Sequence, residues 1–260
     1  QGVQPVVRWG VRMRLICVVG LIIAGFAPTA VATANPSFWQ RMFDPKAAAL
    51  ADAMRLGDQL LGRFPDNPRP SALARVYDHY RHMAATWPEE PIAHLRLAGI
   101  ITHLMEVCTP SCATPKDRAL ALEALAHWQA YFDLAPGDER TFAAMFQRSI
   151  LRTKVGGEQL ALAAQDYRKL IALGDLGAYL GSPSVLHLNL AEVLMMDSSL
   201  DAAIDEYRVA VSLSSEPSSA YGLAVALDRA GYVDEARDVI RDLGKSALEE
   251  YKVSIDRGDT

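Results

Sequence analysis

The sequence predicts an all-α protein made of about five antiparallel helical hairpins. After residue 35, apolar residues recur three and four positions apart, and no stretch shows the sustained alternation of a half-buried strand. The breaks between these segments are short, and short connections place consecutive helices antiparallel to each other. The expected helices span about residues 45–62, 71–87, 91–107, 115–134, 138–153, 158–173, 183–197, 200–213, 217–230 and 233–243.

Three of these helices carry a start signal. Asp44, Thr114 and Ser182 each stand directly before a proline. The side-chain oxygen of such a residue can accept a hydrogen bond from the first helical turn, and the missing N–H of the proline has no helical partner in any case. We therefore expect helices to begin near residues 45, 115 and 183.

The composition excludes several classes of protein. Half of the 260 residues are hydrophobic, which is too many for a disordered chain, and three cysteines are too few for a disulfide scaffold. The net charge of −5 gives no general reason to bind nucleic acid. A packed helical protein with no nucleic-acid partner is the class that remains.

Residues 1–34 have the layout of a secretory signal peptide. Three arginines precede an apolar run over residues 15–26, and small residues follow, with Ala32 and Ala34 in the A-x-A spacing of a cleavage site. We expect cleavage after Ala34 or Ala32 and a periplasmic or secreted protein. The alternatives are an uncleaved anchor in the inner membrane and a cytoplasmic chain. Membrane contact is expected only through this segment.

Four residues of one predicted hairpin recur 33 positions later in the next. The pairs are Leu190 and Leu223, Ala191 and Ala224, Leu194 and Leu227, and Ala203 and Ala236. This pattern resembles the tetratricopeptide repeat (TPR) family, in which small residues let the two helices of a hairpin approach closely and large residues fill the space beside them. The resemblance implies a right-handed superhelix, or solenoid, of stacked hairpins, TPR-like in its architecture.

The resemblance covers most of the chain but is uneven. It is strongest over 184–243, whereas upstream the matching alanines, Ala124 and Ala163, lie at steps longer than the family period. A generic all-α bundle is the alternative fold. The expected organisation is a signal peptide (1–34), an N-terminal segment with one helix (35–70), a TPR-like domain (71–245), and a terminal cap or truncated next repeat (246–260).

The sequence contains no recognisable catalytic motif. There is no nucleophile elbow, phosphate-binding loop, dinucleotide fingerprint or zinc-protease motif. His79 and His82 lie three apart on one predicted helix, but no third metal ligand follows in local spacing. We expect no enzyme activity and no cofactor.

Cys108 and Cys112 form the most distinctive local feature. In an oxidising compartment they are candidates for a small disulfide that closes the inserted loop between two helices. The alternatives are a metal or redox site assisted by His103 and Glu106, and two free thiols. The spacing is one residue too long for a haem attachment motif.

The family resemblance also implies where a partner would bind. The first helix of each hairpin lines a concave groove, and fixed positions of that helix point into it. In this sequence those positions include Ile92, Leu95, His103, Leu188, Glu192, Met195, Met196, Tyr221, Val225, Asp228 and Arg229.

These features together predict a non-catalytic interaction scaffold of the bacterial cell envelope that binds a peptide or protein partner. Two alternatives stay open: the helical recognition domain of a larger envelope enzyme or assembly factor, and a metal or redox protein that depends on its cysteines and histidines.

Overall fold

The computed structural model describes residues 35–61, 70–108, 114–174, 183–214 and 216–257, and every regular element in these ranges is a helix. The helices are α2 (Phe38–Phe43), α3 (Pro45–Leu61), α4 (Pro70–Thr86), α5 (Pro91–Cys108), α6 (Pro115–Leu134), α7 (Thr141–Val155), α8 (Gln159–Ala172), α10 (Ser184–Met196), α11 (Leu200–Leu213), α12 (Pro217–Ala230) and α13 (Val233–Arg257).

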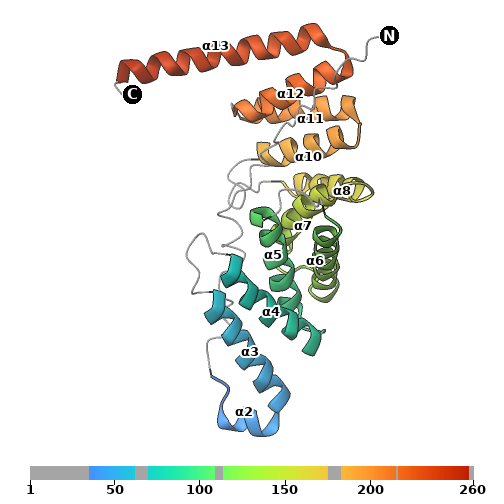
Figure 1. The fold of residues 1–260 in the computed structure, drawn as a ribbon, viewed down its shortest axis with the longest axis vertical. Coiled ribbons are helices and arrows are strands. Elements are labelled where there is room, and N and C mark those ends of the chain that lie inside the picture. The colour runs from blue at the N-terminus through green and yellow to red at the C-terminus, as the bar shows by residue number, and fades with distance from the viewer. Residues whose placement is uncertain (1–34, 62–69, 109–113, 175–182, 215, 258–260) are drawn as a thin grey trace.

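Consecutive helices pack as hairpins, and the hairpins stack along the molecule. The pairs are α3 with α4, α5 with α6, α7 with α8, α10 with α11 and α12 with α13. Figure 1 shows this stack running from α2 at one end to α13 at the other. The predicted fold class, a TPR-like all-α solenoid of about five hairpins, is confirmed.

Two of the three predicted start signals act as expected. Asp44 Oδ1 accepts a hydrogen bond from the backbone N–H of Ala47 at 2.9 Å, and Thr114 Oγ1 accepts one from Asp117 at 3.1 Å. The third residue, Ser182, lies outside the described residues, and α10 begins directly after Pro183. These side chains satisfy N–H groups that the first turn leaves without a helical partner.

The largest error in a helix start concerns α7, which we predicted from residue 138 and which begins at Thr141. The Asp138 carboxylate accepts hydrogen bonds from the backbone N–H and the guanidinium of Arg140, at 2.6–2.8 Å. This short-range pairing holds residues 138–140 in a turn.

The repeat residues form the interior of the stack. Alanines at the shared small position are buried, and so are the aromatic residues four positions later in three hairpins: Ala124 with Trp128, Ala163 with Tyr167, and Ala203 with Tyr207. The core falls into two clusters of buried residues, which we call the N-terminal core (centred on α4–α6) and the C-terminal core (centred on α8 and α10–α12). Helix α7 supplies Leu151 to the first and Ile150 to the second.

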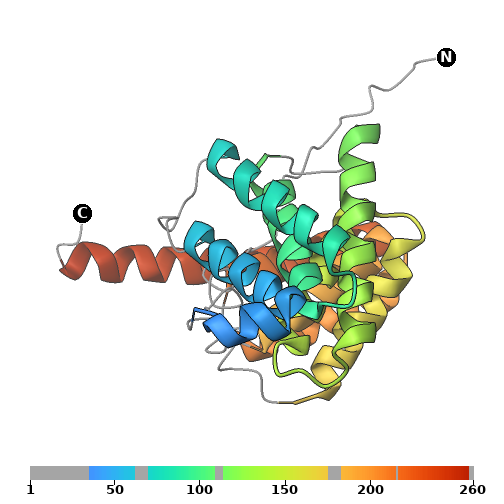
Figure 2. The same cartoon turned by 90° about the horizontal axis from the view of Figure 1, so that it is seen from below.

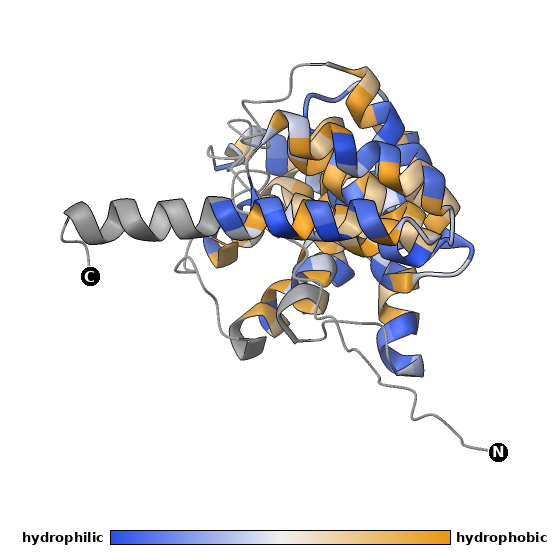
Figure 3. Ribbon diagram, turned by 90° about the horizontal axis from the view of Figure 1, so that it is seen from above, coloured by the Kyte–Doolittle hydropathy of each residue, from blue (hydrophilic) through white to orange (hydrophobic). Residues whose placement is uncertain are grey.

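The two ends of the stack differ from the prediction. Residues 35–61, the described part of the predicted N-terminal segment, hold two helices where we predicted one, because Ser37 and Gln40 form a reciprocal capping box that starts the short helix α2. At the other end α13 continues without a break from Val233 to Arg257, so no separate element begins at residue 246. Gly244 lies inside this helix and does not end it. Seen from the α13 end, hydrophobic and hydrophilic residues alternate along its first half (Figure 3).

None of the helices in the described ranges has both the length and the hydropathy that a membrane span requires. The predicted signal peptide, residues 1–34, lies outside those ranges.

Candidate functional site

The predicted groove residues lie on the first helices of three hairpins, α5, α10 and α12, and they differ in accessibility. Ile92 and Leu95 pack in the N-terminal core, and Leu188 and Met195 pack in the C-terminal core. These four side chains contribute little accessible surface, because helices of the same and neighbouring hairpins cover them. Glu192 is also buried, and His103 is half-buried.

The accessible groove residues gather toward the C-terminal end. Met196 and Tyr221 are each 46% exposed, Asp228 and Arg229 are exposed, and Val225 is half-buried. Four of these five residues belong to α12. The register predicted from the sequence therefore identifies a helix face, whereas the packing of the hairpins decides how much of that face a partner can reach.

The carboxyl group of Glu192 is buried, and one of its two oxygen atoms has no hydrogen-bond partner among the described residues. Only 8% of the residue is exposed, and the oxygen atom without a partner there is Oε2. Burial raises the pKa of Glu192 to about 7. Asn189 Nδ2, one turn away, and the Tyr207 hydroxyl are likewise buried without a partner among the described residues. Buried polar groups without hydrogen-bond partners destabilise an apolar interior, so these three side chains lower the stability of the C-terminal core.

A buried ion cluster that the sequence analysis did not predict joins α7 to α8. Arg148 donates two hydrogen bonds to Asp166, at 2.9 Å from Nε and 2.7 Å from Nη2, and Arg152 also donates to this carboxylate. The Arg148 guanidinium lies 4.2 Å from the centre of the Phe132 ring. Burial and the neighbouring Arg148 lower the pKa of Arg152. Two cations share one anion, so the cluster ties the hairpin together and offers no free nucleophile or base.

Two histidines from the α5–α6 hairpin, buried His94 and half-buried His127, form a second polar contact. The Nδ1 atoms of His94 and His127 are 2.8 Å apart, and His94 Nε2 donates to the Pro88 carbonyl oxygen at 3.0 Å. A hydrogen bond between two Nδ1 atoms needs one of them unprotonated. Burial, and secondarily the proximity of His94, lower the pKa of His127.

Nothing in the described part of the chain assembles a metal site. No three side chains of His, Cys, Asp or Glu there lie close enough together to hold an ion. His79 instead has its Nε2 atom 2.9 Å from the Ala53 carbonyl oxygen, the distance of a hydrogen bond. Cys108 ends α5, but Cys112 lies outside the described residues, so the predicted disulfide and its alternatives stay predictions.

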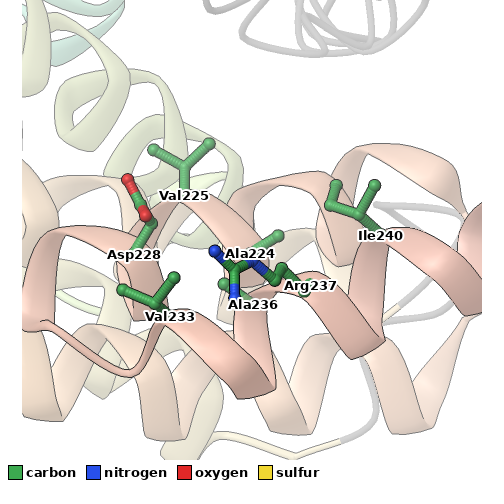
Figure 4. A pocket seen from close by; sticks show the side chains of 7 residues that line it. All are labelled: Ala224, Val225, Asp228, Val233, Ala236, Arg237 and Ile240. Atoms are coloured by element: carbon green, nitrogen blue, oxygen red, sulfur yellow. The ribbon is translucent and has the colours of Figure 1, made fainter.

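An open pocket lies between α12 and α13, at the C-terminal end of the stack. Its volume is about 470 Å³. Figure 4 shows Val225, Asp228 and Val233 at one end of the group and Ile240 at the other, with the Arg237 side chain between them. The full lining is Ala224, Val225, Asp228, Val233, Ala236, Arg237 and Ile240. Two predicted groove residues, Val225 and Asp228, are part of it.

The preceding hairpin shows what this kind of surface contacts when a neighbour is present. Shifted back by the 33-residue repeat, Ala236, Arg237 and Ile240 become Ala203, Ile204 and Tyr207, which are all buried. Helix α12 packs against α11 there, and it approaches so closely that a Cβ atom at Gly222 would overlap the Tyr207 ring. The pocket is therefore the stacking surface of the last hairpin, without a helix on it among the described residues.

The α13 side of this pocket was not among the predicted groove residues, although the 33-residue repeat indicates it. Val233 and Ile240 are 39% and 45% exposed, and Tyr232 beside them is 51% exposed. Aligning the last two hairpins would have matched Ile240 with buried Tyr207 and shown that apolar stacking positions persist to the end of the repeat.

Comparisons with known proteins support the fold. No protein-family model matches the chain, and no curated protein matches it. Among solved structures, the chain is similar to the crystal structure of MamA protein, with a TM-score of 0.58 and 15% identity over 79% of this chain and 96% of that chain. It is also similar to MamA 41-end from Desulfovibrio magneticus RS-1, with a TM-score of 0.56 and 13% identity over 77% of this chain and 96% of the other. At these identities the likeness shows a common helical fold.

Proposed function

We propose that this protein is a non-catalytic protein–protein interaction scaffold of the bacterial cell envelope. The observation that supports this most directly is the open stacking surface between α12 and α13, whose counterpart one repeat earlier is covered by a helix. A helical solenoid binds partners along its surfaces, and its fold supplies no chemistry of its own.

The lining of the pocket indicates what kind of partner segment fits. Val225, Val233 and Ile240 offer apolar surface, so an amphipathic helix with large apolar residues at i and i+3 or i+4 would bury them. Asp228 lies at one end of this surface and Arg237 lies across its middle, and Arg237 forms an exposed ion pair with Asp234 at 3.1 Å. A partner helix with a basic residue facing Asp228 and an acidic residue facing Arg237 would complement both.

The envelope location rests on the sequence of residues 1–34. Its test is the mass of the N-terminal peptide of protein recovered from the periplasmic fraction. An N-terminus at residue 33 or 35 supports export and cleavage, and an intact residue 15–26 segment in the recovered protein contradicts them.

The partner-binding surface is tested by placing a photo-crosslinking amino acid at Tyr221 or at Ile240 in living cells. A partner should crosslink from both positions, and the crosslink from Tyr221 should be lost when Asp228→Arg and Ile240→Asp are combined. Both residues are exposed, so helicity and thermal stability should stay unchanged.

A matched control carries the same kinds of change on α6, where Leu122 and Asp133 are exposed. Leu122→Asp with Asp133→Arg should leave the crosslink intact. A crosslink that survives the α12–α13 variant, or that disappears equally in the α6 variant, contradicts this site.

A further inference from the structure

The short helix α2 exposes an unusual amount of apolar surface. Phe38, Trp39, Met42 and Phe43 are between 60% and 76% exposed, and none of them belongs to either core. At 3.6 residues per turn these four positions fall within an arc of about 140°. The aromatic rings form a contiguous surface, because Trp39 stacks on Phe43 at 5.7 Å and Phe38 meets Trp39 edge-on at 5.3 Å between ring centres.

The polar side of α2 is the side that the protein holds. Arg41 donates two hydrogen bonds to Asp52 of α3, at 2.7 and 3.2 Å, and Arg55 donates to the same carboxylate at 2.8 Å. The capping box of Ser37 and Gln40 fixes the start of the helix. An ordinary surface helix buries its apolar face and leaves its charges in water. Helix α2 is attached in the opposite sense, with its apolar face outward.

The position of α2 leaves this face accessible. Figure 1 places it at the end of the stack opposite α13, and in Figure 2, the view from below, α2 and α3 lie nearest the viewer. No other described helix besides α3 makes more than marginal contact with it.

The size of the surface argues against a second copy of the chain as its occupant. Large apolar side chains have about 150–250 Å² each to bury, so four side chains exposed by about two-thirds offer on the order of 500 Å². A stable protein–protein interface needs about 800 Å² from each partner. The aromatic face is too small to hold a dimer by itself.

The composition and surroundings of the face fit a lipid surface. Tryptophan and phenylalanine are favoured where an apolar environment meets a wet one, and an apolar helix face can lie in the headgroup region without spanning the bilayer. The α2–α3 segment has equal numbers of charges of each sign: Arg41, Lys46 and Arg55 against Asp44, Asp52 and Asp58.

The upstream sequence brings this face near a membrane. The apolar run over residues 15–26 ends eleven residues before α2, and eleven extended residues span at most about 40 Å. A chain whose apolar run is inserted in a bilayer during export therefore keeps α2 close to that bilayer.

We propose that α2 is an interfacial membrane-binding element, whose face of Phe38, Trp39, Met42 and Phe43 enters the headgroup region of a lipid bilayer. The proposal stands apart from the proposed function, because it concerns the other end of the stack and does not depend on a protein partner. It adds a membrane contact to the one expected from residues 1–34.

Trp39 provides the readout. The experiment uses the full chain carrying Trp9→Phe. The tryptophans that then remain besides Trp39 are Trp87 and Trp128, and both are buried. A change in tryptophan emission when vesicles are added therefore reports on Trp39. We expect vesicles of phosphatidylethanolamine and phosphatidylglycerol to shift its emission to the blue. Bromine-labelled acyl chains in these vesicles should remove most of its emission. Both effects should persist at high salt, because the surrounding charges balance.

Three variants make the result specific. Trp39→Phe, added to the Trp9→Phe chain, should show neither the blue shift nor the quenching. Phe38→Ser combined with Phe43→Ser should abolish the quenching of Trp39. Leu122→Ser with Leu162→Ser, which replaces exposed apolar residues on α6 and α8, should leave it unchanged. Every variant keeps residues 15–26, so tethering through that segment is the same in all of them.

Trp39 emission that vesicles do not alter overturns the proposal. A blue shift that instead follows protein concentration without lipid, together with a rise in molar mass, also overturns it and assigns the face to a second copy. Binding that disappears at high salt would assign the contact to charged groups and contradict insertion of the aromatic face.

Discussion

Ser198 occupies a turn position that Gly231 occupies one repeat later. Both follow the first helix of a hairpin, and both have positive φ, 63° for Ser198 and 90° for Gly231. The same hydrogen bond closes the two turns: Ser199 N–H donates to the Leu194 carbonyl oxygen and Tyr232 N–H to that of Leu227, each at 2.9 Å. A side chain in this left-handed conformation costs about 1 kcal/mol, which glycine avoids.

We therefore expect Ser198→Gly to raise the free energy of unfolding by about 1 kcal/mol, which for a chain of this size raises Tm by about 2–4 °C. Thermal and urea denaturation measure the change. The reverse substitution, Gly231→Ser, should lower stability by a similar amount. If the two changes fail to have opposite signs, the two turns are not equivalent.

Glu192 makes stability depend on pH in an unusual direction. Its pKa of about 7 in the folded protein exceeds the ordinary value near 4.5, so between these pH values the folded state binds more protons than the unfolded state. The free energy of unfolding therefore falls as pH rises from about 4.5 to about 7.

Glu192→Gln should remove this dependence and stabilise the protein above pH 7 by up to about 3 kcal/mol. Urea denaturation across this pH range, compared between the two proteins, provides the measurement. The exposed Glu139→Gln is the control and should parallel the parent. Parallel curves for Glu192→Gln and the parent would show that this carboxyl is solvated in the folded state.

At the scale of the element, the Asp166 carboxylate joins α7 to α8 by pairing with Arg148 and Arg152. Asp166→Asn would leave two buried guanidinium groups side by side, so we expect a loss of about 3–5 kcal/mol in denaturation experiments. The matched change Asp234→Asn removes an exposed carboxylate that pairs with Arg237, and it should cost less than about 1 kcal/mol. Equal costs for the two changes would contradict the assignment of the α7–α8 cluster as a buried pair.

Most elements could be predicted from the sequence because helix periodicity is a local property. The repeat spacing also predicted the buried alanines, such as Ala203 and Ala236. Helix α2 was missed because six residues are too few to show a period. The α13 end was misjudged because the repeat resemblance ends near residue 245, whereas the helix continues to Arg257.

The candidate site could be predicted only in part. The family register placed Val225 and Asp228 on the face that lines the pocket, but it also included Leu188 and Met195, which neighbouring hairpins cover. Coverage depends on contacts between hairpins, and these lie outside any local pattern. The pairing of Arg148 with Asp166 was missed because it joins the two helices of one hairpin, and no local pattern relates residues on different helices.

At the scale of the whole molecule, the described residues form two cores, and α7 supplies side chains to both of them. In a stacked repeat protein each hairpin contacts its neighbours, so stability is close to a sum of local and nearest-neighbour terms. A cavity in one core should therefore loosen nearby hairpins more than distant ones. Hydrogen exchange can separate these regions, because it reports local and global opening of the backbone.

Ile101→Ala, in the fully buried middle of α5, should cost about 2–5 kcal/mol and should speed amide exchange in α4–α6 more than in α11–α13. Leu190→Ala, equally buried in α10, should produce the opposite gradient, and the pair of variants serves as its own control. If each substitution instead accelerated exchange equally along the whole chain, the protein would be unfolding as one cooperative unit. Helix α7 would then transmit destabilisation between the cores, because it supplies residues to both.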